Sequence, residues 1–466
     1  MLNREAPPPG SAIIGLLICR FRLLPDAYVI GGSLRDGLPD RRVGISLSLN
    51  ALPDKIVLLG YQMRRAGMAS KSAWPAISHE LLEWIPSARA WPTREEAELA
   101  GQTIKYSAAV PASIAGQNYV PGSDLTSLAE EAVLAITRFD STVGTEIAPF
   151  SSILLRSEAA ASSRIENLTA SARAILSAEA GDTSKRNATQ IAANTTSMRA
   201  ALSLAMDLNA DAILAMHAAL MEGDERHTPG QWRDEPVWIG TREVSPVGAE
   251  YVAPDSARIP ALIEDLICYI NRSDVPVLIQ AAIAHAQFET IHPFTDGNGR
   301  TGRSLLQAML RAKGVTRLVT IPVSAGLLTD TEGYHRALTA YRSGSPDVII
   351  ELVARSCFTA INNADLLVGD IEKARLRWRD VVKARRDSAL WQVIDIASRQ
   401  PVLNANIVAG ELGMSPTNVY RYLDQLATAG VLQGFNIHRR GRFWRADEIL
   451  RALDAFAARA SRRDRA

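Results

Sequence analysis

The sequence predicts a mainly α-helical protein with a small β-hairpin in its core and a winged helix-turn-helix module at its C-terminus. Apolar residues recur at helical spacing through much of 124–220 and on both sides of a glycine-rich loop at 292–303. Residues 237–251 are β-prone and contain the turn residues Ser, Pro and Gly. In the last hundred residues, two short helical patterns are followed by two short strand patterns.

The glycine-rich loop reads His-Pro-Phe-Thr-Asp-Gly-Asn-Gly-Arg-Thr-Gly-Arg over residues 292–303. An Ala-rich helical pattern at 277–291 precedes it, and helical periodicity resumes at 304–312, so the loop joins two helices. Gly297 and Gly299 have no side chain to block close approach. The backbone N–H groups at the start of the second helix can therefore converge on an anion, and phosphate is the predicted guest.

The charged residues of this loop suit polyphosphate chemistry. Asp296 would repel a bare phosphate, so its presence predicts a divalent cation such as Mg²⁺ that bridges the carboxylate and the phosphate oxygens. Arg300 and Arg303 lie three residues apart at the start of the second helix, where both guanidinium groups can clamp a polyphosphate. Because histidine titrates near neutral pH, His292 is the candidate general base for an attacking hydroxyl.

The loop resembles the Fic signature His-x-Phe-x-Asp/Glu-Gly-Asn-Gly-Arg-x-x-Arg. The residues at its fixed positions are His292, Phe294, Asp296, Gly297, Asn298, Gly299, Arg300 and Arg303. The resemblance implies a protein adenylyltransferase that moves AMP from ATP to a hydroxyl side chain of a target protein, or of itself, and releases pyrophosphate. It makes His292 the general base and Asp296 the Mg²⁺ ligand. The implied nucleotide-binding residues are Gly297, Asn298, Gly299, Arg300, Thr301, Gly302 and Arg303. Related Doc kinases carry Lys in place of Gly299, so this glycine favours AMP transfer.

A second motif, Ser162-Ser163-Arg164-Ile165-Glu166-Asn167, fits the pattern Ser/Thr-x-x-x-Glu-Gly/Asn. In enzymes that this chain resembles, the pattern is inhibitory, which implies that Glu166 pairs with Arg303 and denies it to the γ-phosphate of ATP. Ser162 and Asn167 are the other fixed positions. Some of these enzymes also remove AMP from their targets, and the sequence leaves that activity open. The structural alternative is that Ser162 is an N-cap with Glu166 in the first helical turn.

Other residues near the loop receive structural interpretations. Residues 237–251 are the predicted flap, a hairpin that in the family pairs with an extended segment of the target. Phe294 is predicted to anchor the loop in the core. His285 is predicted to be buried and hydrogen-bonded rather than a metal ligand, and Tyr334 to pack in the core. His217 has no partner visible in the sequence and supports no site.

The C-terminal part of the chain is basic. Residues 371–466 contain 18 Lys or Arg and 10 Asp or Glu, a net charge of +8, although the whole chain carries only +1. Helical patterns at 406–412 and 415–429 flank Gly413, and two strand patterns with a turn at Gly441 follow. This order is typical of a winged helix-turn-helix.

Such modules bind either DNA or protein, and the sequence leaves both open. In the DNA interpretation, Tyr420 and Arg421 lie on the recognition helix. The wing residues that would meet phosphates are Arg439, Arg440 and Arg442. Two classes of function follow: an AMP-transferring enzyme whose tail recruits or regulates, and a DNA-binding regulator whose Fic core senses nucleotide. The complete signature favours the enzyme, because a regulator alone has no need of His292.

The composition is that of a soluble globular protein, with 47% hydrophobic and 22% charged residues among 466. Cys19, Cys268 and Cys357 lack disulfide or metal-ligand spacing, which suits a reducing compartment. The longest apolar stretch near the start, residues 12–19, is too short to span a bilayer, so a cytoplasmic protein with no membrane partner is expected. The oligomeric state stays open, a homodimer included.

The chain is predicted to divide into four parts. Residues 1–67 are a leader that is poorly ordered or not translated, with Met68 as the candidate start, because no helical or strand period extends through them. Helical structure is expected from around Glu80. The other parts are an N-terminal helical region with the inhibitory motif at 68–220, a Fic catalytic core at 221–365 and the winged helix-turn-helix module at 366–466.

Overall fold

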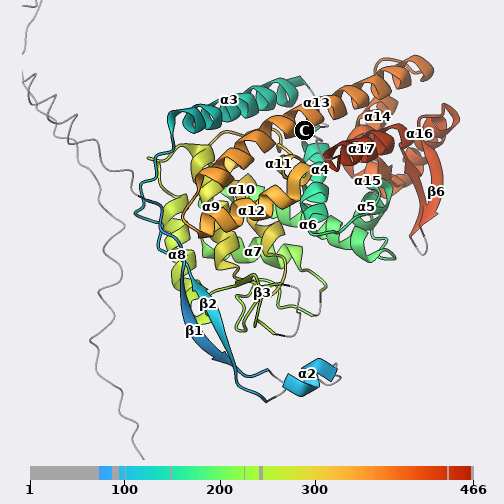
Figure 1. Ribbon diagram of the computed structural model, residues 1–466. Helices are drawn as coiled ribbons and strands as arrows, with labels where there is room; N and C mark the ends of the chain where they lie inside the picture. Colours follow the sequence, from blue (N-terminus) through green and yellow to red (C-terminus); the bar gives the residue numbers. More distant parts are fainter. Residues whose placement is uncertain are drawn as a thin grey trace, which may run out of the picture. The chain divides into compact units, whose positions relative to one another are not determined.

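A computed structural model of the chain describes residues 73–86, 94–99, 101–146, 150–224, 226–240, 245–437 and 440–462. The predicted leader, the candidate start Met68 and the wing residue Arg439 lie outside these ranges. The described part is mainly helical, as predicted (Figure 1). None of its helices is long and apolar enough to cross a membrane.

The N-terminal elements are β1 (Ser78–Trp84), α2 (Arg94–Leu99), β2 (Ile104–Val110), α3 (Ser123–Glu146), α4 (Phe150–Ile165), α5 (Ala172–Glu179), α6 (Arg186–Ser203) and α7 (Ala210–Leu220). The central elements are β3 (Trp238–Ile239), β4 (Tyr251–Val252), α8 (Ile259–Ile270), α9 (Val277–Ile291), α10 (Asn298–Ala312), α11 (Val323–Leu327) and α12 (Thr331–Arg342). The C-terminal elements are α13 (Asp347–Val381), α14 (Ala389–Arg399), β5 (Val402–Leu403), α15 (Ala405–Leu412), α16 (Pro416–Thr428), β6 (Gln433–Ile437), β7 (Gly441–Arg445) and α17 (Asp447–Ala460).

The prediction of a helix around Glu80 is wrong, because this residue lies in strand β1. β1 pairs antiparallel with β2, with Ser78 opposite Val110. Glu and Leu dominate β1 and favour helices, but pairing with a partner strand overrides that preference. β2 shows the alternation of a strand, with Ile104 and Tyr106 buried and the residue between them exposed. The chain therefore has a hairpin ahead of its first long helix.

The helix predicted before the loop is α9, which forms the centre of the core. Every residue of α9 from Leu278 to Ile291 is buried. The small side chains of its Ala-rich sequence let α8, α10, α12 and α13 pack around it. The loop at its C-terminal end is therefore attached to a helix that is buried along almost its whole length.

The predicted domain boundary at residue 366 falls inside α13, a continuous helix of 35 residues. Its first half packs against α3, α9 and α12, and its second half contacts α14 and α17 (Figure 1). Buried residues occur along its whole length, from Ile349 to Trp378. One helix therefore belongs to the central helical core and to the C-terminal module at the same time.

The two helices predicted in the C-terminal module are α15 and α16. Gly413 ends α15 in the left-handed conformation, with φ of 63°, and Ser415 caps α16 by accepting a hydrogen bond from the N–H of Asn418. The strands form a sheet in the order β5-β7-β6, and Gly441 has φ of 89° where the hairpin turns. This module lies against α4 and α5.

Candidate active site

The glycine-rich loop turns through two residues in the left-handed conformation. His292 ends α9 with φ of 49°, and its N–H donates to the carbonyl of Phe288. Gly297 precedes α10 with φ of 80°. A side chain at Gly297 would also lie 2.9 Å from Leu220, so glycine is required on two counts. A histidine in this conformation is strained, and such strain is typical of functional sites.

Two side chains inside the loop hold its shape. The amide oxygen of Asn298 accepts from the N–H of Phe294 at 2.9 Å, and its amide nitrogen donates to the carbonyl of the same residue at 2.8 Å. The predicted apolar anchor, Phe294, is fully buried and stacks on His217 with ring centroids 3.6 Å apart. The prediction that Asn298 binds phosphate is therefore limited to its backbone N–H, because its side chain is committed to the loop.

His217 and Arg233 support the loop from outside, and the sequence analysis predicted neither role. Nδ1 of His217 accepts from the N–H of Gly230 at 3.0 Å, so the proton lies on Nε2, 3.1 Å from the carbonyl of Asp296. Burial lowers the pKa of His217 to about 4, which keeps it neutral. Arg233 donates to the carbonyls of His292 at 2.9 Å and Pro254 at 2.6 Å.

His292 lies at the loop with a largely buried imidazole, 16% exposed. Burial, together with the cations of Arg342 and Arg233, lowers its pKa to about 4. The imidazole is therefore neutral at neutral pH and can accept a proton. The nearest carboxylate is that of Glu289, whose Oε2 lies 4.0 Å from Nδ1.

Arg303 and Glu166 form an ion pair at the start of α10. Nη2 of the buried Arg303 lies 2.8 Å from Oε1 of Glu166, and its Nε donates to Oγ of Ser162 at 2.9 Å. The carboxylate of Glu166 also lies so close to Gly299 that any side chain at that position would overlap it. An anionic group therefore occupies the space beside the first helical turn, where the free N–H groups of α10 converge.

Residues 162–167, called here the Ser162–Asn167 segment, lie at the C-terminal end of α4. Ser162 is buried inside the helix, and the N–H of Leu168 donates to the carbonyl of Ser163 at 3.0 Å. Asn167 ends the turn with φ of 60°, a conformation that asparagine tolerates better than most residues. The alternative in which Ser162 caps the start of a helix is wrong.

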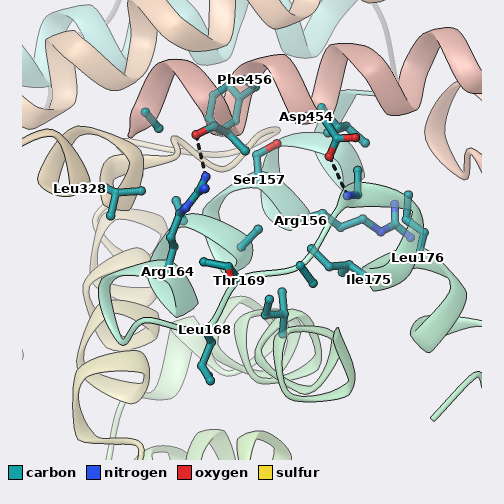
Figure 2. Close-up of a pocket in the computed structure, with 18 residues that line it drawn as sticks. Arg156, Ser157, Arg164, Leu168, Thr169, Ile175, Leu176, Leu328, Asp454 and Phe456 are labelled. Carbon is teal, nitrogen blue, oxygen red and sulfur yellow. Dashed lines mark hydrogen bonds between the residues drawn. The ribbon is translucent and has the colours of Figure 1, made fainter. Parts of the chain in front are cut away.

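The opposite face of α4 is held by α5 and by the C-terminal module (Figure 2). The buried Arg156 donates to Glu179 of α5 at 2.9 Å and to the carbonyl of Arg399 at 2.8 Å. Arg164 donates to the carbonyl of Ala457 in α17 at 2.9 Å. Between α4, α5, α6 and α17 lies a mostly apolar cavity of about 60 Å³. The helix that carries Glu166 is therefore a direct neighbour of the C-terminal module.

The predicted metal ligand, Asp296, faces the loop with a carboxylate that is 42% exposed. Its Oδ1 accepts from the N–H of Gly297 at 2.7 Å, and its Oδ2 lies 3.3 Å from Nη2 of Arg300. Over the described ranges, no group of three or more His, Cys, Asp or Glu residues could hold a metal ion alone. One partly exposed carboxylate suits Mg²⁺ only when phosphate oxygens complete its ligands, as in nucleotide sites.

The remaining predicted nucleotide-binding residues differ in their exposure to the site. Arg300 is only 4% exposed, and its Nε has no partner among the described groups. The N–H of Thr301 donates to the carbonyl of Gly297, and its side chain is fully buried. A side chain on Gly302 would lie 2.8 Å from Oε1 of Glu289. Thr301 and Gly302 therefore serve the packing of α10 and do not line the cradle for an anion.

Residues 207–310, which include the loop, match the model of the Fic/DOC family. A 120-residue stretch is 31% identical to the protein adenylyltransferase fic-1 of Caenorhabditis elegans and covers 25% of this chain and 22% of that protein. A 109-residue stretch is 33% identical to a probable protein adenylyltransferase of Aquifex aeolicus (strain VF5), over 23% of this chain and 31% of that protein. This chain thus spans less than a third of each relative. A Fic family protein of known structure from Desulfovibrio desulfuricans G20 aligns with a TM-score of 0.45 and 24% identity, over 70% of this chain and 97% of that one.

Proposed function

We propose that this chain, which contains a Fic domain at residues 207–310, transfers AMP from ATP to a hydroxyl side chain of a target protein or of itself. One observation carries the proposal. The neutral imidazole of His292 lies on the same loop as the free N–H groups at the start of α10, where Arg303 supplies a buried cation. A proton acceptor beside a phosphate cradle is what nucleotidyl transfer to a hydroxyl requires.

In the proposed reaction, Nε2 of His292 accepts the proton of the target hydroxyl. The hydroxyl oxygen then bonds to the α-phosphorus, the bond from that phosphorus to the β-phosphate oxygen breaks, and pyrophosphate leaves with the electron pair. Arg300, Arg303 and the N–H groups of α10 would hold the outer phosphates and keep the attack in line. Asp296 would hold Mg²⁺ together with those phosphates, and the ion would neutralise their charge.

The β3–β4 hairpin is the proposed docking strand for the target. Trp238 pairs with Val252 and Ile239 with Tyr251. The hydroxyl of Tyr251 donates to the carbonyl of Thr290, two residues before His292. An extended segment that pairs with this hairpin would therefore be aligned directly against the loop that carries the base.

We also propose that the Ser162–Asn167 segment inhibits the enzyme. The carboxylate of Glu166 lies 2.8 Å from Arg303 and in contact with Gly299, so a phosphate at the same place would have to displace it. A carboxylate and a phosphate compete directly for one guanidinium group. Nucleotide would therefore bind productively only when this segment moves.

The contacts behind α4 suggest that the C-terminal module keeps the Ser162–Asn167 segment in place. We expect the Phe456→Leu variant, which enlarges the cavity against α4, to raise self-labelling with α-labelled ATP roughly 2- to 10-fold, because weakening this interface by about 1 kcal/mol favours release of Arg303. The measurement is the initial rate of label incorporation. Arg451→Ala, an exposed change on the same helix, is the control. Unchanged labelling with a lowered melting temperature would mean that the interface serves stability alone.

The second candidate function is DNA binding by the C-terminal module. Tyr420 and Arg421 are exposed on α16, and the region 371–466 is basic. Part of the wing is engaged elsewhere, because Arg442 pairs with Asp424 at 3.0 Å and the guanidinium of Arg440 lies against Gly181. Among the described basic residues of the module, those of α16 are therefore more available to a duplex than Arg440 and Arg442.

If the module binds DNA, the full-length chain should bind a fluorescent duplex at least tenfold more weakly at 200 mM than at 50 mM salt, because phosphate contacts release counterions. The Arg421→Ala variant should weaken binding further, and Arg138→Ala, an exposed change on α3, should not. Fluorescence anisotropy measures both effects. Binding that is absent or independent of salt would end this candidate and favour a protein partner.

A further inference from the structure

Glu289 is a buried carboxylate one helical turn before His292, and the proposed reaction does not yet use it. The residue is 5% exposed, and its Oε2 lies 4.0 Å from Nδ1 of His292. Positions three apart on a helix share one face, so α9 directs the carboxylate toward the imidazole that follows it. The two groups therefore face each other inside the protein.

Both groups contain a polar atom that lacks a hydrogen-bond partner. Nδ1 of His292 and Oε1 of Glu289 are both buried and unpaired among the described residues. Unpaired buried polar atoms are rare, because each loses its hydrogen bonds to water without replacement. One is a nitrogen that can donate and the other an oxygen that accepts, so a modest rotation of the Glu289 side chain would pair the two groups. The backbone carbonyl of Glu289 also interacts with the imidazole and competes with the Glu289 carboxylate as the hydrogen-bond acceptor.

The charges around His292 show how this pairing would change the proton affinity of the imidazole. Burial and the cations of Arg342 and Arg233 lower the pKa of His292 to about 4, and the carboxylate of Glu166 opposes them from the Ser162–Asn167 segment. A base with so low a pKa is weak at neutral pH. Once Glu166 has withdrawn, Glu289 is the buried carboxylate that remains beside the imidazole. Its ionisation would raise the proton affinity of the base.

Glu289 has its own electrostatic environment. Burial and the carboxylate of Glu166 together raise its pKa to about 7, against the opposing effect of the cations of Arg303 and Arg342. When Glu166 withdraws, its carboxylate no longer repels the negative charge of Glu289. Ionisation of Glu289 then becomes easier, so the same movement that frees Arg303 would also charge the partner of the base.

We propose that Glu289 is a positioning residue for His292. Its carboxylate accepts a hydrogen bond from Nδ1–H of the imidazole, so that Nε2 is free to take the target's proton. The inference rests on the proposed function. In the step, the hydroxyl proton moves to Nε2 as the oxygen bonds to the α-phosphorus and pyrophosphate leaves with the electron pair. The proton on Nδ1 stays between the imidazole and Glu289, whose negative charge stabilises the imidazolium.

The alternative is that Glu289 serves Arg303 and not His292. It would then replace Glu166 as counter-ion when the Ser162–Asn167 segment moves, and it would tune the binding of the nucleotide's outer phosphates. This role predicts an effect on the KM for ATP. The positioning role predicts an effect on kcat and on the imidazole itself.

The test compares Glu289→Gln with Glu158→Gln in the full-length Glu166→Gly chain. Glu158 is a control for the loss of a buried carboxylate that interacts with Arg303, because it is 1% exposed, burial also raises its pKa to about 7 against the effect of Arg303, and it binds Ser324 of α11. The ¹⁵N signals of the His292 ring, assigned by their loss in His292→Asn, report its tautomer and proton affinity. Label transfer from α-labelled ATP gives kcat, the KM for ATP and the pH profile.

For Glu289→Gln we expect a proton affinity of His292 about tenfold weaker and a kcat about 10- to 100-fold lower, with the KM for ATP changed less than about twofold. The acidic arm of the pH profile should move to lower pH, because the imidazole then protonates only at lower pH. Glu158→Gln should leave the proton affinity of His292, kcat and the pH profile unchanged.

Unchanged ¹⁵N signals in Glu289→Gln, or a loss confined to the KM for ATP, would overturn the positioning role. The proposed function fails separately, if the Glu166→Gly chain transfers no label at all. The ¹⁵N measurement still reports on the pair of Glu289 and His292 in that case, since it needs no activity.

Discussion

Replacing His292 with asparagine in the Glu166→Gly chain should lower the transfer of label from α-labelled ATP by about 10²- to 10⁴-fold, the usual contribution of a general base. The substitution removes the proton acceptor but leaves the N–H groups of α10 and the guanidinium of Arg303 in place. ATP should therefore bind with nearly unchanged affinity, which isothermal titration calorimetry measures. A large fall in rate with intact binding identifies a group that acts on the transition state.

The choice of asparagine matters, because residue 292 has φ of 49°. Asparagine tolerates this left-handed conformation, whereas alanine at the same position would add about 1 kcal/mol of backbone strain. His292→Ala is thus the harsher variant, and the two should agree in rate if the imidazole alone is responsible. Labelling at the parental rate in His292→Asn would reject the assignment of the base.

Replacing Glu166 with glycine should raise self-labelling of the wild-type chain by about 10- to 100-fold, within the usual range for a coupling between two sites. The carboxylate pairs with Arg303 at 2.8 Å and lies against Gly299, so its removal frees both the cation and the space beside α10. Incorporation of α-labelled ATP over time measures the effect. The affinity for ATP should rise together with the rate, because the nucleotide no longer competes with a carboxylate.

Two further variants separate charge from shape. Glu166→Gln keeps the size of the side chain and removes its charge, so it should release the enzyme only partly. Glu130→Gly, an exposed change on α3, should have no effect on labelling. If wild type and Glu166→Gly label equally, the Ser162–Asn167 segment merely ends a helix.

The sequence predicted those parts of the site that depend on local chain geometry. The loop at 292–303, the helices on both sides of it, the anchor Phe294 and the buried His285 could all be inferred from residue types and spacing. The structure confirms the burial of both side chains, and His285 lies 2.7 Å from the hydroxyl of Tyr334. Neighbours in sequence fix such features, so a single chain is enough to predict them.

The features that the sequence did not predict depend on which partner each group meets in the folded chain. β1 reads as helical until its pairing with β2 is known, and the partners of Arg233 are backbone carbonyls, which have no sequence signature. Asn298 is a predicted nucleotide-binding residue, but residue type alone does not show that its side chain hydrogen-bonds to Phe294 within the same loop and leaves only the backbone N–H for phosphate. The residue type determines which hydrogen bonds a side chain can make, and the fold determines which of them form.

The continuity of α13 has a practical consequence for cloning. A fragment that begins at residue 366 would keep only half of this helix and would uncover the surface of α17 that packs against α4, α5 and Asn363 in the intact chain. A fragment that stops at this point would uncover the surfaces of α4 and α5 that pack against α17 in the intact chain. Truncated versions cut at this point should aggregate, so functional assays on this protein belong on the undivided polypeptide.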